Sequence, residues 1–253
     1  MITLKSRAEI DKIEAACRIV VGTLESLEAK IKPGVATREL DDLAAAYMKE
    51  KGAVSAFKGY KGFPAHICTS INETVVHGIP GDRVLKEGDI IAIDVGVKLN
   101  GYYGDAAMTF PVGKVPDEAV KLMEVTEESL YRGIENARPD KRLYDVSSAV
   151  QEHVEKNGFS VVREFVGHGI GTRMHEDPQI PNFGAPDTGP RLKSGMVLAI
   201  EPMVNAGTYR VEILDDGWTA VTKDRKLSAH FEHTVYVGEN GPEILTKWRK
   251  RKR

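Results

Sequence analysis

The sequence predicts an α+β protein made of two pseudo-symmetric halves, in which helices flank a curved, mostly antiparallel sheet. Four segments carry apolar residues at helical spacing, and short β-branched runs typical of strands lie between them. A phrase also recurs along the chain, because residues 85–94 read LKEGDIIAID and residues 192–201 read LKSGMVLAIE. Each copy ends an apolar run on a carboxylate, Asp94 or Glu201, so we interpret the two copies as an internal duplication.

Composition narrows the class of protein. The 253 residues suit one domain over residues 1–253, since no linker separates the halves. A formal net charge of -2 gives no reason to expect nucleic acid or a membrane as partner. No apolar run is long enough for a transmembrane helix, and the first residues lack the apolar core of a signal peptide. Cys17 and Cys68 form no CxxC pair, which favours the reducing cytoplasm over a disulfide framework.

The first helix is expected after Ser6, which forms a capping box with Glu9, and residues 32–34 close it. Thr37 is the expected N-cap of a second helix that stops at Gly52. The apolar stripes of both helices predict core packing. Shorter elements follow, namely a loop at 58–64, strands at 67–71 and 74–77, and a loop at 78–82.

A central hairpin comes next. Residues 90–93 form a β-branched run typical of a strand covered on both faces, residues 98–101 read as its turn, and residues 102–110 return. With that four-residue turn, Asp94 and Asp105 stand directly opposite each other. Facing carboxylates repel unless they share a proton or hold a cation. We therefore favour a cation there over two solvated aspartates on an edge hairpin.

The second half repeats the pattern of helices followed by strands. Its expected elements are helices at 117–137 and 143–157, a strand at 161–166, a loop at 177–190, a hairpin at 211–217 and 218–222, and a last strand at 231–237. The basic run at 247–253 reads as a short solvated tail, with a weak electrostatic dock as the alternative.

Four acids and one histidine form the candidate metal site. His168 lies between glycines, where the backbone can bend to aim an uncrowded ring. Alternation along the last strand puts His230 and Glu232 on one face and His233 on the other, and we choose Glu232 for the site. Four carboxylates and one imidazole suit two divalent ions, drawn from Mn²⁺, Fe²⁺, Co²⁺ and Zn²⁺. The predicted ligands are Asp94, Asp105, His168, Glu201 and Glu232.

Over nearly its whole length the chain resembles the type I methionine aminopeptidases. The residues that carry the likeness are SINETVVHGIP at 70–80, Asp94 with Asp105, GHGIG around His168, MHEDPQIPNF at 174–183, AIEPM around Glu201 and LSAHFEHT around Glu232. The resemblance implies the pita-bread fold, whose pseudo-two-fold halves agree with the repeat. It also implies a hydrolase that removes the N-terminal methionine when the second residue is small.

The resemblance further implies a role for each site residue. Asp94 would be a terminal ligand at one metal site, and His168 with Glu201 would be terminal ligands at the other. Asp105 and Glu232 would bridge the two sites. Glu201 would handle the proton of the attacking water. His175 would hydrogen-bond the scissile carbonyl, and His77 would contact the peptide nitrogen. The methionine side chain would lie among Tyr60, Phe63, Cys68, Met174 and Trp218, for which ordinary core packing is the alternative reading.

The likeness also implies nascent polypeptide N-termini as substrates, with the ribosome as a candidate partner. Charge, hydropathy and cysteine usage add the expectation of no membrane, no specific nucleic acid and a place in the cytoplasm, and we expect a monomer. About 30 residues separate Glu201 from Glu232, which leaves no room for the helical insertion of type II enzymes. The sequence departs from the expected pattern at Phe57, Phe63, Met174 and His230, which concerns the shape of the pocket.

Two alternatives stay open at this point. A pita-bread peptidase that cleaves before proline would usually carry an extra N-terminal domain, whereas the catalytic fold here is expected to start almost at Met1. A relative without catalysis, serving as a peptide-binding module, would typically have lost ligands, and all five are present. Metal analysis of the purified protein would separate the second alternative from the enzyme.

Overall fold

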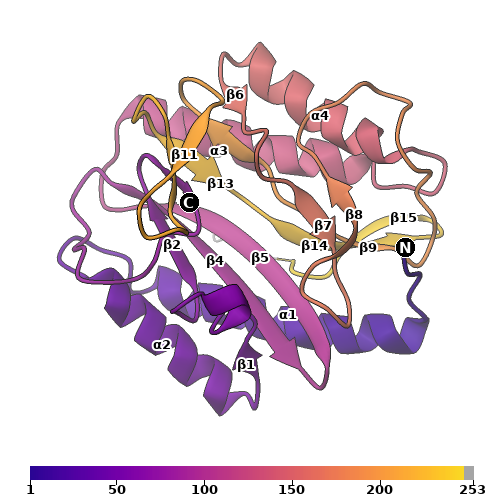
Figure 1. The fold of residues 1–253 in the computed structure, drawn as a ribbon, viewed down its shortest axis with the longest axis horizontal. Helices are drawn as coiled ribbons and strands as arrows, with labels where there is room; N and C mark the ends of the chain where they lie inside the picture. The colour runs from indigo at the N-terminus through magenta and orange to yellow at the C-terminus, as the bar shows by residue number, and fades with distance from the viewer. Residues whose placement is uncertain (248–253) are drawn as a thin grey trace.

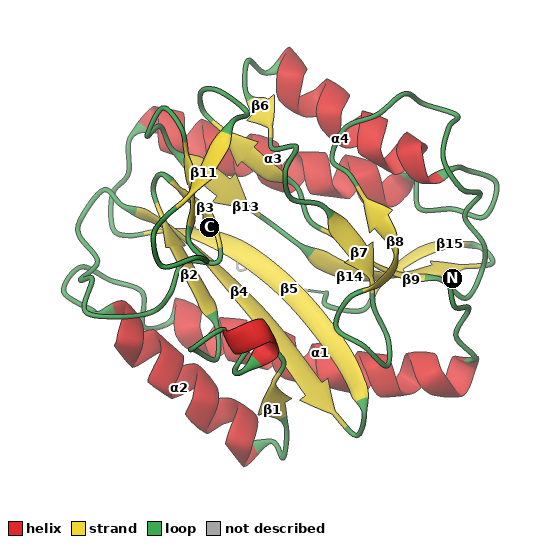
Figure 2. Ribbon diagram, in the orientation of Figure 1, coloured by secondary structure: helices red, strands yellow, loops and turns green. Residues whose placement is uncertain are grey.

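The computed structural model describes residues 1–247, in which two pairs of helices enclose a strongly curved region of β-structure (Figure 1). The helices are α1 (Arg7–Glu28), α2 (Thr37–Glu50), α3 (Asp117–Glu135) and α4 (Leu143–Lys156). In the view of Figure 2, α1 and α2 lie below the strands, and α3 and α4 lie above them. All four helices stand near their predicted positions, and each pair packs together.

Within residues 1–247, the strands form four small sheets. The first half contributes β1 (Val54–Ser55), β2 (Cys68–Ile71), β3 (Thr74–Val76), β4 (Ile90–Leu99) and β5 (Tyr102–Pro111), with a 3-10 turn, η1, at Tyr60–Gly62. The second half contributes β6 (Ser160–Val161), β7 (Gly167–Gly169), β8 (Glu176–Ile180), β9 (Val197–Ile200), β10 (Met203–Asn205), β11 (Val211–Ile213), β12 (Ala220–Thr222), β13 (Ser228–His230), β14 (His233–Gly238) and β15 (Gly241–Ile244).

Two of these sheets carry the site. In the first, β4 pairs with β1, β2 and β5, and in the second the order is β15-β14-β9-β7-β8. The smaller sheets have the orders β13-β10-β6 and β11-β12-β3. The strand pairs found within residues 1–247 are all antiparallel, as predicted. Helix α1 packs on β4 and β5, and α3 packs on β10 and β13, so the apolar core lies between helices and sheets.

Local chemistry explains where the helices start. The Glu9 carboxylate accepts a hydrogen bond of 2.8 Å from the backbone N–H of Ser6, as the capping box predicts. The N-cap of α2 is Ala36 rather than Thr37, which corrects the prediction. Thr37 instead begins the helix, and its hydroxyl accepts a hydrogen bond of 2.8 Å from the N–H of Gly81. The threonine therefore ties α2 to a loop instead of capping it.

The central hairpin has a tighter turn than predicted. Only Asn100 and Gly101 form it, with φ of 49° and 84°. Two left-handed residues in a row match the twist of paired strands, which makes this the favoured short hairpin turn. The register moves accordingly, so Asp94 stands opposite Ala107 and Asp105 stands opposite Gly96. The two aspartates are therefore not directly opposed. They remain on one face of the hairpin because the shift is two residues.

Three further predictions about strands need correction. The segment 177–190 is not all loop, because β8 covers Glu176–Ile180 with Pro178 inside it. That strand lies at the edge of its sheet, where a missing N–H is tolerated. The predicted strand at 161–166 is reduced to β6, since the chain exposes Arg163 and Glu164 beyond it. The last strand, predicted at 231–237, begins later, as β14 at His233–Gly238, and residues 228–230 before it form β13 in a different sheet.

The repeated phrase marks a real structural repeat. Leu85 and Leu192 are both buried, and Gly88 and Gly195 both adopt left-handed φ, of 91° and 96°. The N-cap residues of α2 and α4 also make matching contacts. Ala36 forms an isolated antiparallel bridge with Val84, just before Leu85, and Arg142 forms one with Arg191, just before Leu192. The matching halves thus extend from the helix pairs to the strands that carry Asp94 and Glu201, which supports the pseudo-symmetric fold.

The predictions about membrane segments, cysteines, domain number and the basic tail have separate outcomes. Within residues 1–247, no helix has both the length and the apolar character needed to cross a membrane. Both cysteines are free and buried, in keeping with the absence of a disulfide framework. The single domain stays a prediction. Of the predicted tail at 247–253, residues 248–253 lie outside the described part of the chain.

Candidate functional site

The predicted metal ligands come from both halves and converge in one place. Asp94 and Asp105 lie on β4 and β5, and His168 lies on β7. Glu201 directly follows β9, and Glu232 lies between β13 and β14. Ligand atoms of Asp105, His168 and Glu232 all lie within 4.8 Å of one another. Nε2 of His168 is 3.6 Å from a carboxylate oxygen of Glu201.

The glycines around His168 are required by close packing of strands. A Cβ at Gly167 would lie 2.4 Å from the carbonyl oxygen of Ala199, and one at Gly169 would lie 2.2 Å from that of Asp177. Only glycine allows the backbones of β7, β8 and β9 to approach this closely. His168 is therefore the one side chain that β7 can present, and it points among the carboxylates.

Glu232 reaches the cluster by a different route from the one predicted. Its N–H donates a hydrogen bond of 2.8 Å to the carbonyl of Ala107 on β5, while the chain passes from β13 to β14. Simple alternation along one strand therefore does not apply. His233 does lie away from the cluster, because its Nδ1 bonds the hydroxyl of Thr246 at 3.0 Å. His230 lies beside the site, with Nε2 3.6 Å from Glu201.

Burial and mutual repulsion make the carboxylates reluctant to ionise. Burial raises the pKa of Asp94 to about 7 and that of Glu201 to about 8. Burial, with the neighbouring negative charges, raises the pKa values of Asp105 and Glu232 well above their usual range. Without a cation among them, these four groups cannot all carry their charge at neutral pH.

The donor set fits divalent cations. One carboxylate oxygen each of Asp94, Asp105 and Glu232 is buried and has no hydrogen-bond partner within residues 1–247. Burial lowers the pKa of His168 to about 3, so its imidazole is neutral as a metal ligand must be. Buried, unpartnered oxygens beside a neutral imidazole are the environment of a hard or borderline divalent ion. The structure therefore supports a divalent-metal site here.

The cluster lines part of a cavity of about 200 Å³. Its walls include every residue predicted for the substrate: His77, His175, Tyr60, Phe63, Cys68, Met174 and Trp218. Phe57 and Lys61 also line the cavity. Sequence reasoning noted Phe57 only as a departure and missed Lys61, which carries no signal beyond its place in a glycine-rich loop. A Cβ at Gly96 would lie 2.5 Å from the Phe57 ring, so this glycine makes room for the larger residue.

Two further histidines border the cavity. His77 has a left-handed φ of 60°, uncommon outside glycine and frequent at functional sites. Its ring meets Phe165 and Trp218 edge-on, with centroids 5.4 Å and 6.2 Å apart. Burial, aided by nearby histidines, lowers the pKa of His77 to about 4. Burial and the charge of Lys61 also lower the pKa of His175, so both imidazoles are neutral near pH 7.

A buried ion pair holds the segment that carries Met174 and His175. Nζ of Lys5 is 2.5 Å from Glu176, and both side chains are 4% exposed. The other oxygen of Glu176 accepts hydrogen bonds of 2.8 Å and 3.1 Å from the N–H groups of Thr172 and Arg173. Burial alone would raise the pKa of Glu176, but Lys5 and these amides outweigh it and the pKa is lowered.

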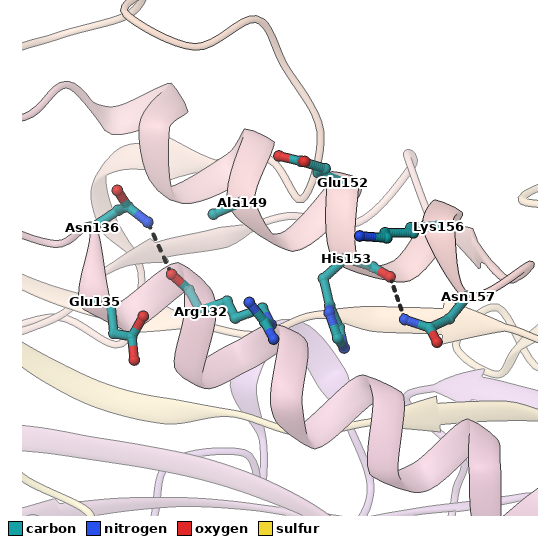
Figure 3. A pocket seen from close by; sticks show the side chains of 8 residues that line it. All are labelled: Arg132, Glu135, Asn136, Ala149, Glu152, His153, Lys156 and Asn157. Carbon is teal, nitrogen blue, oxygen red and sulfur yellow. Dashed lines mark hydrogen bonds between the residues drawn. The ribbon is translucent and has the colours of Figure 1, made fainter.

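A second hollow, of about 400 Å³, lies between α3 and α4 (Figure 3). Two of its lining residues already have a partner, because Glu128 lies 2.6 Å from Arg132 and 3.6 Å from His153. Asn136 and Asn157 cap backbone carbonyls on its rim. Within residues 1–247, the one group of side chains found that could hold a metal lies in the central cavity instead.

Comparison with known proteins agrees with this geometry. The model of metallopeptidase family M24 matches residues 11–239. The chain is 58% identical over 247 residues to methionine aminopeptidase 1 of Bacillus subtilis (strain 168), covering 98% of this chain and 100% of the relative. It is 57% identical over 246 residues to the methionine aminopeptidase of Clostridium perfringens, covering 97% and 99%.

Solved structures give the same result. The methionine aminopeptidase of Thermotoga maritima superposes with a TM-score of 0.96 at 48% identity, covering 98% of this chain and 100% of that one. Prolidase from Pyrococcus furiosus superposes with a TM-score of 0.78 at 27% identity, covering 98% of this chain and 66% of that one. The fold is thus shared with prolidase, which is longer than this chain, while the Thermotoga maritima methionine aminopeptidase matches over its full length.

Proposed function

The chain belongs to metallopeptidase family M24 and, within it, to the methionine aminopeptidases, and on this basis we propose how its cavity acts. It is a metal-dependent hydrolase that removes the N-terminal methionine of polypeptides. The observation that carries the proposal is that a buried acid cluster and an apolar pocket meet in one cavity of about 200 Å³. The pocket takes the methionine side chain, and the cluster lies at the scissile bond.

We infer that Asp94, Asp105, His168, Glu201 and Glu232 hold two divalent ions. Four carboxylates balance two doubly charged cations, and the raised pKa values of the acids indicate how strongly they favour such charge compensation. When bound, divalent ions polarise the scissile carbonyl and lower the pKa of water. Co²⁺, Mn²⁺, Fe²⁺ and Zn²⁺ all suit this ligand set.

The remaining steps belong to side chains of this chain. The Glu201 carboxylate takes a proton from the attacking water and passes it to the departing amine as the peptide bond breaks. His175, neutral in the cavity, donates a hydrogen bond to the carbonyl oxygen while negative charge develops there. His77, also neutral, contacts the peptide nitrogen and steadies the leaving amide.

The shape of the cavity determines which peptides fit. Tyr60, Phe63, Cys68, Met174 and Trp218 can wrap an unbranched thioether, and aromatic rings contact sulfur favourably. His77 and His175 stand beside the ligands, so the second residue of the substrate must be small. Nascent polypeptide N-termini are the substrates that we propose. A monomer in the cytoplasm and a contact with the ribosome remain predictions.

Release of the first residue from matched tripeptides tests this function. Metal-free protein should be inactive and should recover when Mn²⁺, Co²⁺, Fe²⁺ or Zn²⁺ is added. Met-Ala-Ser should then be cleaved rapidly, Met-Phe-Ser hardly at all, and Leu-Ala-Ser more slowly than Met-Ala-Ser. A hydrophobic pocket separates such similar side chains by about 1–3 kcal/mol, or about 10–200-fold in kcat/KM. Equal kcat/KM for Met-Ala-Ser and Met-Phe-Ser, or faster release of leucine, would refute the assignment. Ala-Pro-Ser serves as the control for the proline-specific alternative and should not be cleaved.

A further inference from the structure

Two imidazoles lie side by side in the cavity but have different hydrogen-bond partners. The ring centroids of His168 and His175 are 4.3 Å apart. Nδ1 of His168 lies 2.9 Å from the carbonyl oxygen of Gly169. A carbonyl can only accept, so this nitrogen carries the proton and Nε2 of His168 keeps its lone pair. That tautomer suits a metal ligand.

The partner of His175 is a hydroxyl instead of a carbonyl. Its Nδ1 lies 2.9 Å from the hydroxyl oxygen of Tyr60. A phenol can donate or accept, but it is a stronger acid than imidazole N–H, and an imidazole nitrogen is a better acceptor than a phenol oxygen. The favoured arrangement therefore has Tyr60 donating to Nδ1 of His175, which places the ring proton on Nε2.

We propose that Tyr60 is a positioning residue that fixes His175 as its Nε2–H tautomer. This tautomer leaves an N–H donor for the scissile carbonyl, whereas the opposite one would present a lone pair and repel the developing oxyanion. What the donor does rests on the proposed function. The tautomer itself follows from the hydrogen bond and from the identity of the two partners. Tyr60 thus contributes more than a wall of the methionine pocket.

The local backbone holds Tyr60 in place for this role. It begins η1, where the N–H of Tyr60 bonds the carbonyl of Phe57 at 2.8 Å. The N–H of Gly59 bonds the carbonyl of Phe63 at 2.9 Å, so the loop closes on itself. Lys61 has a left-handed φ of 47°, a conformation that a lysine keeps only where its surroundings enforce it. The Tyr60 and His175 rings also lie against each other, with centroids 5.2 Å apart.

The variant Tyr60→Phe tests the proposal, because it removes the hydroxyl and keeps the ring. Phe63→Leu is the matched control, since it alters the same pocket but has no hydrogen bond to His175. In zinc-loaded protein labelled with ¹⁵N-histidine, the imidazole nitrogens report the tautomer, and His175→Gln assigns its signals. Wild-type protein should show Nε2–H at His175, and Tyr60→Phe should show a mixture of tautomers. Zinc content should stay at the wild-type level in both variants.

The kinetic readout separates positioning from pocket shape. Loss of a hydrogen bond that orients a metal-bound histidine typically costs about 10–100-fold in activity, and we expect an effect of the same size at His175. Tyr60→Phe should lower kcat by this factor with little change in KM. Phe63→Leu should raise KM and leave the tautomer of His175 unchanged. Wild-type kcat in Tyr60→Phe, or Nδ1–H at His175 in the wild-type protein, would overturn the proposal. If the wild-type enzyme released no methionine, the proposed function would fail while the tautomer measurement would still decide the hydrogen bond.

Discussion

At the scale of the residue, burial sets the charge of the groups in the cavity. It raises the pKa of Asp94 to about 7 and of Glu201 to about 8, and it lowers the pKa of His77 to about 4. Acids and imidazoles are both driven toward their neutral forms. His168 and His175 are both neutral for this reason, so their position relative to the carboxylates is what separates a ligand from a hydrogen-bond donor.

We predict opposite phenotypes when these two histidines are removed. His168→Ala should lower metal content, because Nε2 of His168 lies 3.6–3.7 Å from Asp105 and Glu201. His175→Ala should keep its metal but lose about 10²–10³-fold in kcat, the usual effect of removing one oxyanion donor. Elemental analysis and steady-state kinetics on both variants check this. If the two phenotypes were exchanged, the assignment of ligand and donor would be wrong.

At the scale of the element, the positions of the helices could be predicted, whereas strand ends and register could not. Helical spacing and Ser6 with Glu9 located α1 because these signals are local. The register of β4 and β5 depends on the conformation of Asn100 and Gly101, which the predicted four-residue turn missed. Pro178 suggested a loop because nothing in the sequence says that β8 lies at an edge.

The walls of the central cavity show the same limit. Their residues were predicted from family resemblance, because Tyr60, Trp218 and Met174 lie far apart in sequence and meet only in the folded chain. No local pattern could link them. Lys61 was missed for a similar reason, since an exposed lysine in a loop looks the same in sequence whether or not a cavity lies beside it.

The buried Lys5–Glu176 ion pair is expected to stabilise the folded chain at the start of β8. We predict that Lys5→Met destabilises the protein by about 3–5 kcal/mol, because it leaves the Glu176 charge buried without its partner. The lowered pKa of Glu176 gives stability that is present above the unfolded value, near 4.5, and is lost as pH falls through the folded value. Lys5→Met should therefore weaken the dependence of stability on pH below about 4.5.

Urea unfolding at neutral and acid pH measures both effects. Lys51→Met is the matched control, since Lys51 pairs with Glu50 on the surface and its loss should hardly change the free energy of unfolding. An unfolding free energy for Lys5→Met equal to that of Lys51→Met would contradict the buried pair's importance.

At the scale of the whole molecule, the metal site makes stability depend on pH. An acid whose pKa is raised on folding holds its proton more tightly in the folded state. Its contribution to the free energy of unfolding therefore falls as pH rises above its unfolded pKa, near 4. Buried histidines have the opposite effect, because they reduce stability as pH falls. The pKa values of His77 and His233 fall to about 4, so stability is lost as pH falls below about 6.5.

As pH rises above 6.5 these histidines become neutral in both states, while the buried carboxylates of the cluster still titrate. With Asp94 at about 7 and Glu201 at about 8, metal-free protein should lose stability steadily from about pH 6.5 to 8. Saturating Mn²⁺ should flatten this decline, because bound cations stabilise the ionised carboxylates. Denaturant unfolding with EDTA or Mn²⁺ across this range measures it. Stability of the metal-free protein that rises over the same interval would contradict the prediction.

The division of the ligands between the halves has an evolutionary consequence. Asp94 and Asp105 come from one half, whereas His168, Glu201 and Glu232 come from the other. If both halves descend from one ancestral sequence, as the repeat indicates, that ancestor could assemble such a cluster only by pairing two copies. Fusion of the copies then removed the requirement that both contribute alike. One half could specialise in a rigid hairpin of carboxylates, while the other acquired the imidazole.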